Sequence, residues 1–373
     1  MQYRIFLLLA PFAIVLCGRP AYAQIPNPEI YKTTVIDAQP LPDQATPPYQ
    51  QTVILQLPSN ADHPEQITIK HGAQTQLLKN ELVSPGDQVI IQAVDQGNQT
   101  NYWIIDFNRT PFLIGLILFF ALLVIISAGK KGLGALIGLA LSIIVILNFI
   151  IPQILNGANP LVISIVGGIG ILSVTLFLAH GLNKPTFIAW ISTLISLIFV
   201  GIIATIAVEL ARLTGTGSEN PNSLRIGITE HINLQGLFLG GIIIGALGVL
   251  DDITTGQTAV VFELKQTNPK LTAIELVYKA RRVGIEHIAS LVNTLVMAYA
   301  GVAMPILIIL VINPQEWPGW AIFNSQIIAE EIIRTISGSI GLILAVPITT
   351  FIAAWYVHKK NPSQLSPANS HHH

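Results

Sequence analysis

The chain has 373 residues, of which 51% are hydrophobic and only 10% are charged, and its mean hydropathy is +0.62. A soluble domain carries about 25% charged residues, so this composition excludes an ordinary soluble protein and indicates one that lies in a membrane. The formal net charge of -1 gives no overall field that would attract nucleic acid, and we expect no nucleic-acid partner.

The first 23 residues have the parts of a secretory signal peptide. Arg4 precedes an apolar run that starts at Ile5, and a small-residue cleavage site ends at Ala23. The alternative is an uncleaved anchor helix, but about a dozen apolar residues are too few for a hydrocarbon core of about 30 Å. In both cases the following segment lies outside. Because Cys17 is the one cysteine, the mature chain would have no disulfide and no cysteine metal site.

Residues 24–107 are more polar than the rest of the chain and alternate in hydropathy. Runs at 51–57, 66–70, 88–94 and 102–107 have the period of strands, and turn sequences such as Ser84-Pro85-Gly86-Asp87 separate them. We predict a small, barrel-like extracytoplasmic β-domain over these residues.

From Pro111 onward the sequence contains apolar windows long enough to span a bilayer, which takes about 20 residues per helix. We place seven transmembrane helices at residues 111–128, 132–151, 160–179, 187–210, 235–256, 286–311 and 333–357. The predicted fold class is therefore a mainly α-helical polytopic membrane protein with a small N-terminal β-domain. The membrane domain covers 108–360, and the tail, 361–373, ends in His371-His372-His373, which is typical of a purification tag.

Basic residues gather in the connections that would lie on the inner side if residues 24–107 are outside. They are Lys130, Lys131, Lys184, Lys265, Lys270, Lys279, Arg281, Arg282, Lys359 and Lys360, five of them in a predicted loop at 265–285. Positive residues stay on the cytoplasmic side of a membrane. We therefore expect a multi-pass protein of the bacterial cytoplasmic (inner) membrane, with its N-terminal domain outside and its C-terminus in the cytoplasm.

Two adjacent carboxylates interrupt the fifth apolar window. Asp251 and Asp252 lie about sixteen residues into it, which places them in the middle or inner half of the bilayer. A carboxylate there costs about 2.5 to 3.5 kcal/mol, and such residues are usually functional. Gly241, Gly245 and Gly248 precede Asp252 on one helical stripe, and small-residue stripes pack against other helices. We predict that Asp252 points into the bundle, while Asp251 is turned about 100° away.

The alternative is that the helix ends at Leu250 and that one aspartate caps a following interfacial helix. The capping box is incomplete, however, because the third residue after Asp252 is Thr255 rather than Glu or Gln. Thr255, Gln257 and Glu263 follow nearby, and their oxygens suit a hard cation or a proton relay. We expect no cofactor beyond such a cation, whose identity stays open.

The last two windows carry further polar groups. Asn293 is placed to share a layer with Asp252, and an interhelical hydrogen bond is an equally good role for it. Glu330, Glu331 and Arg334 have the spacing of a local ion pair at the outer helix end. A re-entrant first section of this helix would instead bring the three to the outer mouth of a cavity.

At these motifs the chain resembles the YibE/F-like family of bacterial multi-pass membrane proteins. The resemblance rests on Arg109-Thr-Pro, Gly129-Lys-Lys-Gly132, His180-Gly-Leu-Asn183, GALGVLDD (245–252), Glu263-Leu-Lys, Val292-Asn-Thr-Leu295 and AEEIIRTISGSIGLILAVPIT (329–349). It implies a multi-pass architecture and assigns no activity. The acid that the family shares aligns with Asp252, whereas Asp251 resembles only a subset.

The leading functional hypothesis is a permease for a small ion or polar solute, with Asp252 as its central carboxylate. Asp251, Thr255, Gln257, Glu263 and Asn293 would surround it. The alternative is an envelope scaffold or sensor in which residues 24–107 bind a partner, and a homo-oligomer is compatible with either. An enzyme is not expected, because no zinc helix, phosphate-binding loop or Ser/His pair at catalytic spacing appears.

Overall fold

The computed structural model describes residues 29–40, 49–57, 65–73, 77–96, 99–217, 232–312 and 318–359. The predicted signal peptide (1–23) and the tail (361–373) lie outside these residues. The chain divides into two compact units, one from Ala21 to Leu123 and one that includes Val124 and everything after it.

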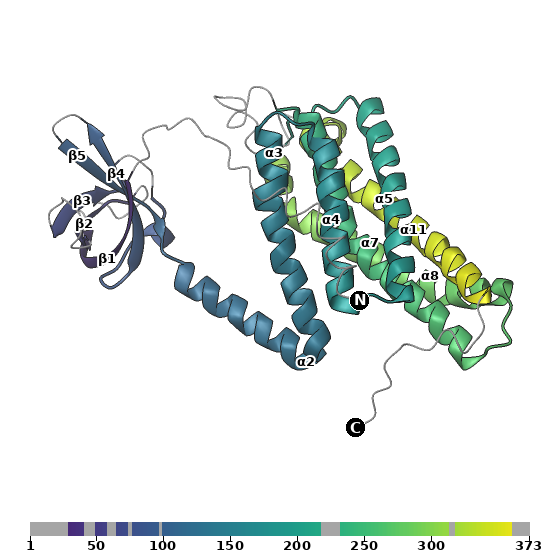
Figure 1. The fold of residues 1–373 in the computed structure, drawn as a ribbon. Helices are drawn as coiled ribbons and strands as arrows, with labels where there is room; N and C mark the ends of the chain where they lie inside the picture. The colour runs from purple at the N-terminus through teal and green to yellow at the C-terminus, as the bar shows by residue number, and fades with distance from the viewer. Residues whose placement is uncertain are drawn as a thin grey trace. The chain divides into compact units, whose positions relative to one another are not determined.

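The first unit is built on one antiparallel sheet. Its strands are β1 (Glu29–Pro40), β2 (Gln51–Gln56), β3 (Gln66–His71), β4 (Gln88–Gln96) and β5 (Gln99–Phe107), in the order β3-β2-β1-β4-β5 (Figure 1). A short 3-10 helix, η1 (Lys79–Glu81), lies between β3 and β4. The four predicted strands are confirmed. The central strand β1 was missed by the sequence analysis.

The sheet curls around its own core, as the predicted barrel-like domain requires. Val35, Val53, Leu55, Val89 and Ile91 alternate along the inner face and are at most 1% exposed. β3 and β5, at opposite ends of the strand order, touch each other, which makes the sheet a half-barrel. Register shifts in β1 and β4 supply the local bends that this curvature needs.

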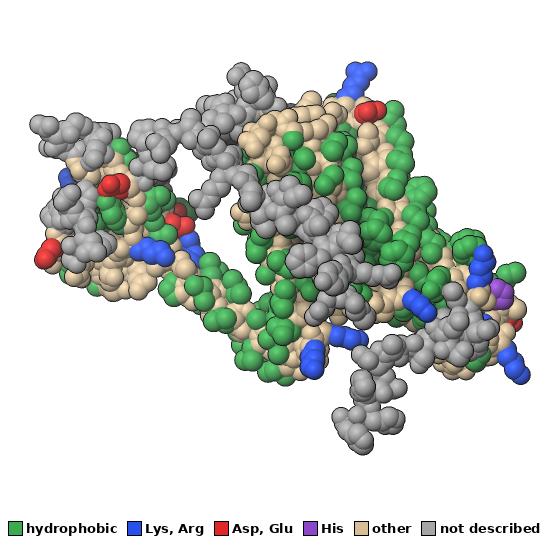
Figure 2. All heavy atoms as spheres, viewed as in Figure 1, with side chains coloured by type: hydrophobic (Ala, Val, Ile, Leu, Met, Phe, Trp, Pro, Cys, Tyr) green, Lys and Arg blue, Asp and Glu red, His purple; other side chains and the backbone are tan. Residues whose placement is uncertain are grey.

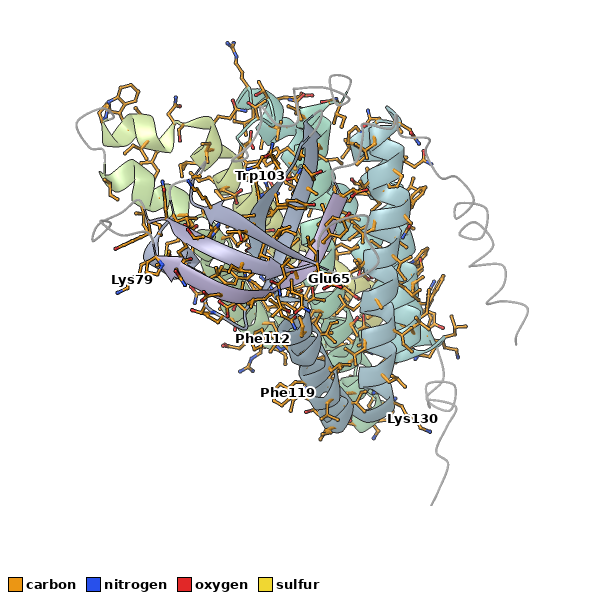
Figure 3. All side chains as sticks on the ribbon, turned by 90° about the vertical axis from the view of Figure 1, so that its left-hand side faces the viewer. Glu65, Lys79, Trp103, Phe112, Phe119 and Lys130 are labelled. Carbon is orange, nitrogen blue, oxygen red and sulfur yellow. The ribbon has the colours of Figure 1, made fainter. Side chains whose placement is uncertain are left out.

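The first apolar helix is bent. α2 (Thr110–Val145) continues through a π-helical segment η2 (Ile146–Ile150) into α3 (Ile151–Leu155), and these 46 residues would be about 69 Å long if straight. Gly129 breaks them with φ 55° and ψ -132°, and Gly132 lies against the Val124 carbonyl. The break separates the predicted spans 111–128 and 132–151. Figure 3 labels Phe112 and Phe119, both exposed, on the first arm of α2.

The remaining helices are α4 (Pro160–His180), α5 (Lys184–Leu210), α7 (Leu234–Thr267), α8 (Ala273–Val302), α9 (Met304–Ile312), α10 (Gly319–Phe323) and α11 (Gln326–His358). Among the described residues, six helical stretches are long and apolar enough to cross a membrane. Since the bent first stretch holds two of the predicted spans, the other five account for the rest. Figure 2 shows hydrophobic side chains over the outer surfaces of these helices.

Three helix limits around the α7–α8 connection and at the end of α8 differ from the prediction. The expected loop at 265–285 is mostly helix, because α7 runs to Thr267 and α8 begins at Ala273. A complete capping box starts α8, in which the Thr272 backbone N–H donates to the Glu275 carboxylate at 2.8 Å. α8 ends at Val302, short of the predicted residue 311. At the α7–α8 connection, hydropathy falls where each helix leaves apolar surroundings, but both helices continue beyond that point.

α7 is the central helix of the second unit and contacts α4, α5, α8 and α11 (Figure 1). The Thr193 and Thr254 hydroxyls, 2.6 Å apart, join α5 to α7, and Ser164 of α4 packs on Gly240 of α7. The contacts show successive helices running in alternate directions. The bend at Gly129, the α4–α5 turn, the α7–α8 connection and the end of α11 therefore share one end of the bundle. It is here called the basic end because nine of the basic residues named above lie there, while Lys360 lies outside the described residues.

Candidate functional site

A row of glycines runs along one face of α7 and ends at an aspartate. Gly241, Gly245, Gly248 and Asp252 share this face, and all four are exposed. We call it the glycine face. The prediction that Asp252 points into the bundle is wrong, because Asp252 is exposed, whereas the stripe does lie against other helices at Gly241, beside Arg334 of α11, and at Gly245, beside Tyr299 of α8. The bundle core is built instead by the opposite side of α7, whose buried residues include Ile242, Ile243, Ala246, Leu247 and Leu250.

Asp251 is the aspartate that points toward protein. It is half-buried, and its Oδ1 atom is shielded from solvent without a hydrogen-bond partner. Thr175 of α4 and Thr255 of α7 face this carboxyl group. The Thr175 hydroxyl donates to the Ile171 carbonyl at 3.0 Å. The Thr255 hydroxyl is within reach of the Asp251 carboxyl, although neither it nor Asp251 Oδ1 makes a hydrogen bond of standard geometry within the described residues. Asp251 therefore presents an unsatisfied carboxylate oxygen at the junction of α4 and α7.

Neither aspartate caps a helix. α7 is continuous from Leu234 to Thr267, and its N-cap is Asn233, whose side chain accepts from the Gly236 backbone N–H at 3.0 Å. The alternative of a helix end at Leu250 is therefore wrong, and the helix is not interrupted at the aspartates. Thr175 lies five residues, or about 8 Å, from the end of α4 at His180 and the same distance from the middle of α4, while Asp251 and Asp252 lie at the middle of α7, so the carboxyl pair lies between the centre of the bundle and its basic end.

Charged groups surround Asp252 at the basic end. Both Asp252 and Lys131 lie close enough to His180 to act on its charge. Three helices supply these residues: Lys131 follows the bend in α2, His180 ends α4 and Asp252 lies on α7. All three are exposed, so this end of the glycine face is open and charged.

A polar layer fills the interior beyond Asp251. Gln257 is fully buried, and its Nε2 atom donates to the Ala280 carbonyl at 2.9 Å and to the Thr350 hydroxyl at 2.7 Å. Its Oε1 atom has no partner, and neither have the hydroxyls of Thr258 and Thr349. Sequence reasoning missed Thr349, Thr350 and Thr193. A useful indication was present, because Ser192, Thr193 and Ser196 are polar residues at helical spacing in an otherwise apolar window.

Two predicted site residues do not join this group. Glu263 and Asn293 are both exposed, on α7 and α8 respectively. Asn293 lies on the side of α8 away from its buried residues Leu276, Ala280 and Gly284. Of the six predicted residues, the structure thus turns Asp251, Thr255 and Gln257 inward and leaves Asp252, Glu263 and Asn293 on open faces.

The predicted outer group is assembled, although differently from the prediction. Glu330 is 4% exposed and accepts from the Gly217 backbone N–H and from Gln326 Nε2, both at 3.0 Å. Glu331 pairs with Arg334, 3.4 Å from Oε1 to Nε. A re-entrant first section is wrong, because α11 is one continuous helix from Gln326 to His358, whereas a first section tangential to the membrane stays a prediction. The group nevertheless meets the glycine face, since a Cβ on Gly241 would lie 3.2 Å from Arg334 Nη1.

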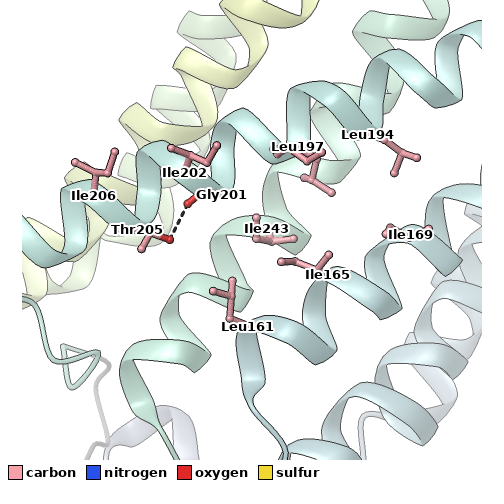
Figure 4. Close-up of a pocket in the computed structure, with 11 residues that line it drawn as sticks. Leu161, Ile165, Ile169, Leu194, Leu197, Gly201, Ile202, Thr205, Ile206 and Ile243 are labelled. Atoms are coloured by element: carbon pink, nitrogen blue, oxygen red, sulfur yellow. Dashed lines mark hydrogen bonds between the residues drawn. The ribbon is translucent and has the colours of Figure 1, made fainter.

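An apolar pocket of about 470 Å³ lies between α4 and α5, apart from these polar groups (Figure 4). Leu161, Ile165 and Ile198 are among its walls, with Ile243 of α7 beside them. Its one hydroxyl, that of Thr205, donates to the Gly201 carbonyl at 2.8 Å. This pocket offers nothing to hold an ion. Within the described ranges, no group of three or more His, Cys, Asp or Glu residues is placed to bind a metal.

Residues 116–359 match the family model described as YibE/F-like protein. The chain belongs to the YibE/F-like family. The match begins inside α2 and ends after α11, so the half-barrel lies outside the matched range of this YibE/F-like protein. Comparisons with curated proteins and with solved structures gave no match.

The two aspartates lie within the matched range and differ in their surroundings. Asp252, which aligns with the acid that the resemblance implies is shared, lies on the open glycine face. Asp251 carries the buried, unpartnered oxygen. The pair therefore presents one carboxylate to an open surface and the other to the protein, side by side on one helix.

Proposed function

We propose that this YibE/F-like protein is a permease that moves a small ion or polar solute across the bacterial cytoplasmic membrane. The observation that carries the proposal is the half-buried Asp251 carboxyl group beside the exposed Asp252. Its shielded Oδ1 atom makes no hydrogen bond of standard geometry within the described residues, and the groups in reach of the carboxyl are the neutral hydroxyls of Thr175 and Thr255. A buried carboxylate is strongly destabilising unless it is protonated, paired or bound to a cation. The carboxyl pair is thus suited to take up and release a proton or a small cation.

The glycine face supports a route to this pair. Glycines leave the α7 surface without side chains, and no heavy atom lies within 4 Å of where a Cβ on Gly248 would be. From Gly241 to Asp252 the face extends about 17 Å, roughly half of the hydrocarbon thickness. It has Arg334 and Tyr299 near one end, and Asp252, His180 and Lys131 at the other.

Oxygen atoms behind Asp251 extend the site. Thr255, Thr258 and Thr349 have unpartnered hydroxyls, and Gln257 has an unpartnered amide oxygen. Neutral oxygens with a carboxylate suit a hard cation or an ordered water that relays protons. We assign Asp251 and Asp252 as the exchanging carboxylates, with these groups as supporting ligands. The proposal requires no cofactor and no enzymatic step.

The distribution of basic residues supports an orientation. Lys130, Lys184 and Lys279 lie at the basic end, with the others named above. By the positive-inside rule this end faces the cytoplasm, which places the start of α2 and the half-barrel outside.

Proton and cation flux in proteoliposomes tests the proposal. We would load vesicles with a pH-sensitive dye and apply outward gradients of K⁺ or Na⁺ in separate samples, each with and without small anions such as phosphate, succinate and chloride in the outer buffer. The full chain should change the internal pH faster than empty vesicles, and Asp251→Asn or Asp252→Asn should reduce the rate by at least tenfold. Glu263→Gln is the matched control and should leave it unchanged. Flux that persists in both aspartate variants, or none in the parent protein, would contradict the proposal.

A scaffold or sensor is the second candidate, and the half-barrel gives it a specific observation. Ile30 and Ile105 are 60% and 51% exposed on the outside of the sheet. Their strands β1 and β5 flank β4, where Gln92 pairs with both Ile30 and Trp103. These two exposed isoleucines, on strands either side of Gln92, are the candidate contact points for a protein partner. This candidate predicts that deleting residues 24–107 abolishes function while Asp252→Asn is tolerated.

A further inference from the structure

We propose that Arg334 and Tyr299, at the end of the glycine face away from Asp252, bind an oxyanion group of the transported solute. The chemical class is a carboxylate or phosphate. This inference rests on the proposed function, because it names the solute that would travel along the same face.

Arg334 has hydrogen-bond donors to spare. Its Nε atom lies 3.4 Å from the Glu331 carboxylate, and its Cζ atom stacks 5.0 Å from the Phe238 ring centre. Charge-assisted N–H···O contacts are normally about 2.7 to 2.9 Å, so the pairing with Glu331 is loose. Guanidinium has five N–H donors, and among the described residues the two terminal nitrogens of Arg334 have no hydrogen-bond partner. The side chain is 25% exposed, which leaves it accessible.

The donors converge on the glycine face. Arg334 Nη1 lies 3.2 Å from the position that a Cβ on Gly241 would take, and Tyr299 Oη lies 2.9 Å from that on Gly245. The two glycines are about 6 Å apart along the helix axis. A carboxylate or phosphate presents two or more acceptor oxygens, and the planar guanidinium fork matches that geometry better than an ammonium would. Tyr299 supplies a hydroxyl donor beside it.

The neighbouring acids are arranged so that Arg334 keeps its charge available. Glu330 is satisfied by Gly217 and Gln326, so its carboxylate is committed to holding that segment. Glu331 is the carboxylate that pairs with Arg334, and a solute oxyanion would compete with it. Without solute, the Glu331 carboxylate therefore pairs with Arg334. A solute oxyanion would bind by displacing it.

The two ends of the glycine face then have complementary roles. Arg334 and Tyr299 bind the anionic group of the solute, while Asp251 and Asp252, about 9 to 17 Å further along the helix, take up the coupling proton or cation. An anion that moves with a cation crosses the membrane with less net charge. This arrangement predicts co-transport of an organic or inorganic oxyanion with a proton or a cation.

Binding to the detergent-purified full chain tests the inference, with inorganic phosphate, succinate and chloride as separate probes in titration calorimetry. Phosphate or succinate should bind and chloride should not, and the stronger of the two identifies the oxyanion. Arg334→Gln should weaken binding at least tenfold, and Tyr299→Phe several-fold. Lys279→Gln, at the basic end, is the charge-matched control and should bind normally.

Glu331→Gln separates a binding role from a structural one. If Glu331 competes with the solute, its removal should tighten binding several-fold, whereas a purely structural ion pair would give weaker binding and a less stable protein. Absence of binding by both oxyanions, or binding that is unchanged in Arg334→Gln, overturns the inference.

The two proposals fail separately. Asp251→Asn should keep oxyanion binding while losing flux. Proton flux in a protein that binds no oxyanion overturns only the inference about the solute. Oxyanion binding through Arg334 without any flux in the parent protein supports the binding site and overturns the permease.

Discussion

Gln257 of α7 and Thr350 of α11 are joined by a 2.7 Å hydrogen bond between two side chains that solvent does not reach. The same Gln257 amide nitrogen donates to the Ala280 carbonyl of α8 at 2.9 Å. One side chain therefore links three helices in the interior of the bundle.

Gln257→Ala should destabilise the protein by about 2 to 4 kcal/mol, because it removes both hydrogen bonds and leaves a cavity. The Thr350 oxygen would lose the donor it accepts from, although its hydroxyl would still donate to the Val346 carbonyl. Reversible unfolding in detergent micelles measures this. Thr294→Ala is the control, since Thr294 is exposed and its hydroxyl donates to the carbonyl of Ser290 on its own helix. Equal stability of the two variants would show that the interhelical link is not stabilising.

A larger side chain should lower the stability of the protein at Gly284 and leave it nearly unchanged at Gly248. A Cβ on Gly284 would clash with Val346 Cγ1, so Gly284→Leu should destabilise the packing of α8 on α11. A Cβ on Gly248 meets nothing within 4 Å, so Gly248→Leu should leave the melting temperature near that of the parent protein.

On the proposed route along the glycine face, Gly248→Leu should nevertheless obstruct flux in proteoliposomes by at least tenfold. Thermal unfolding and flux are measured on the same preparation. A stable Gly248→Leu variant with full flux would place the route elsewhere, and an unstable one would contradict the open environment of Gly248.

The bend at Gly129 should depend on glycine. Its φ of 55° with ψ of -132° lies in a region that side-chain-bearing residues rarely occupy, and forcing one there costs about 1 to 3 kcal/mol. Gly129→Ala should lower stability by this amount, measured by thermal unfolding. Gly115→Ala in the same helix is the control, because it has an ordinary helical conformation and open space around it. Alanine tolerated equally at both positions would show that the bend is not strained.

His71 should make the half-barrel sensitive to mild acid. Burial lowers the pKa of His71 below 6.5, so its neutral form is favoured in the folded state. As the pH falls below 6.5 the unfolded chain takes up the proton first, and stability that is present above pH 6.5 is lost as the pH falls through the folded pKa. Hydrogen exchange of β3 amides from pH 7.5 to pH 5 measures this loss. His71→Gln should flatten the profile, and an unchanged slope in that variant would assign the effect to another group.

The strands and helices were largely predictable from local pattern. Four strands and the apolar windows follow from alternation and from length, which are properties of neighbouring residues. β1 was missed although it is the central strand, because its inner face combines Tyr31, Thr33 and Val35, and Thr33 is buried only by pairing with β2 and β4. Local hydropathy cannot predict that a polar residue such as Thr33 becomes buried when the sheet forms.

Helix ends and helix faces were predicted less well, for a related reason. Windows of hydropathy placed the end of the fifth span near residue 256, whereas backbone hydrogen bonding carries α7 to Thr267. The buried Lys265 donates to the carbonyls of Pro269 and Leu271, both at 2.8 Å, which fixes the turn that follows. These hydrogen bonds bury the charged Lys265 at the α7–α8 connection. Its charge alone predicts an exposed loop there.

The sequence by itself determined that the chain is a membrane protein with an N-terminal β-domain, a set of long apolar helices and a carboxyl pair within one of them. Those features depend on composition, period and length. Only the tertiary structure decided which side of α7 is inside, because a 3.6-residue period defines a face without stating what packs against it. Ile242, Ile243 and Leu250 outcompete the glycines for the core, since each buries far more apolar surface. That choice leaves Asp252 on the open glycine face, turns Asp251 toward Thr175 and brings Arg334 and Tyr299 onto the same surface from distant parts of the chain.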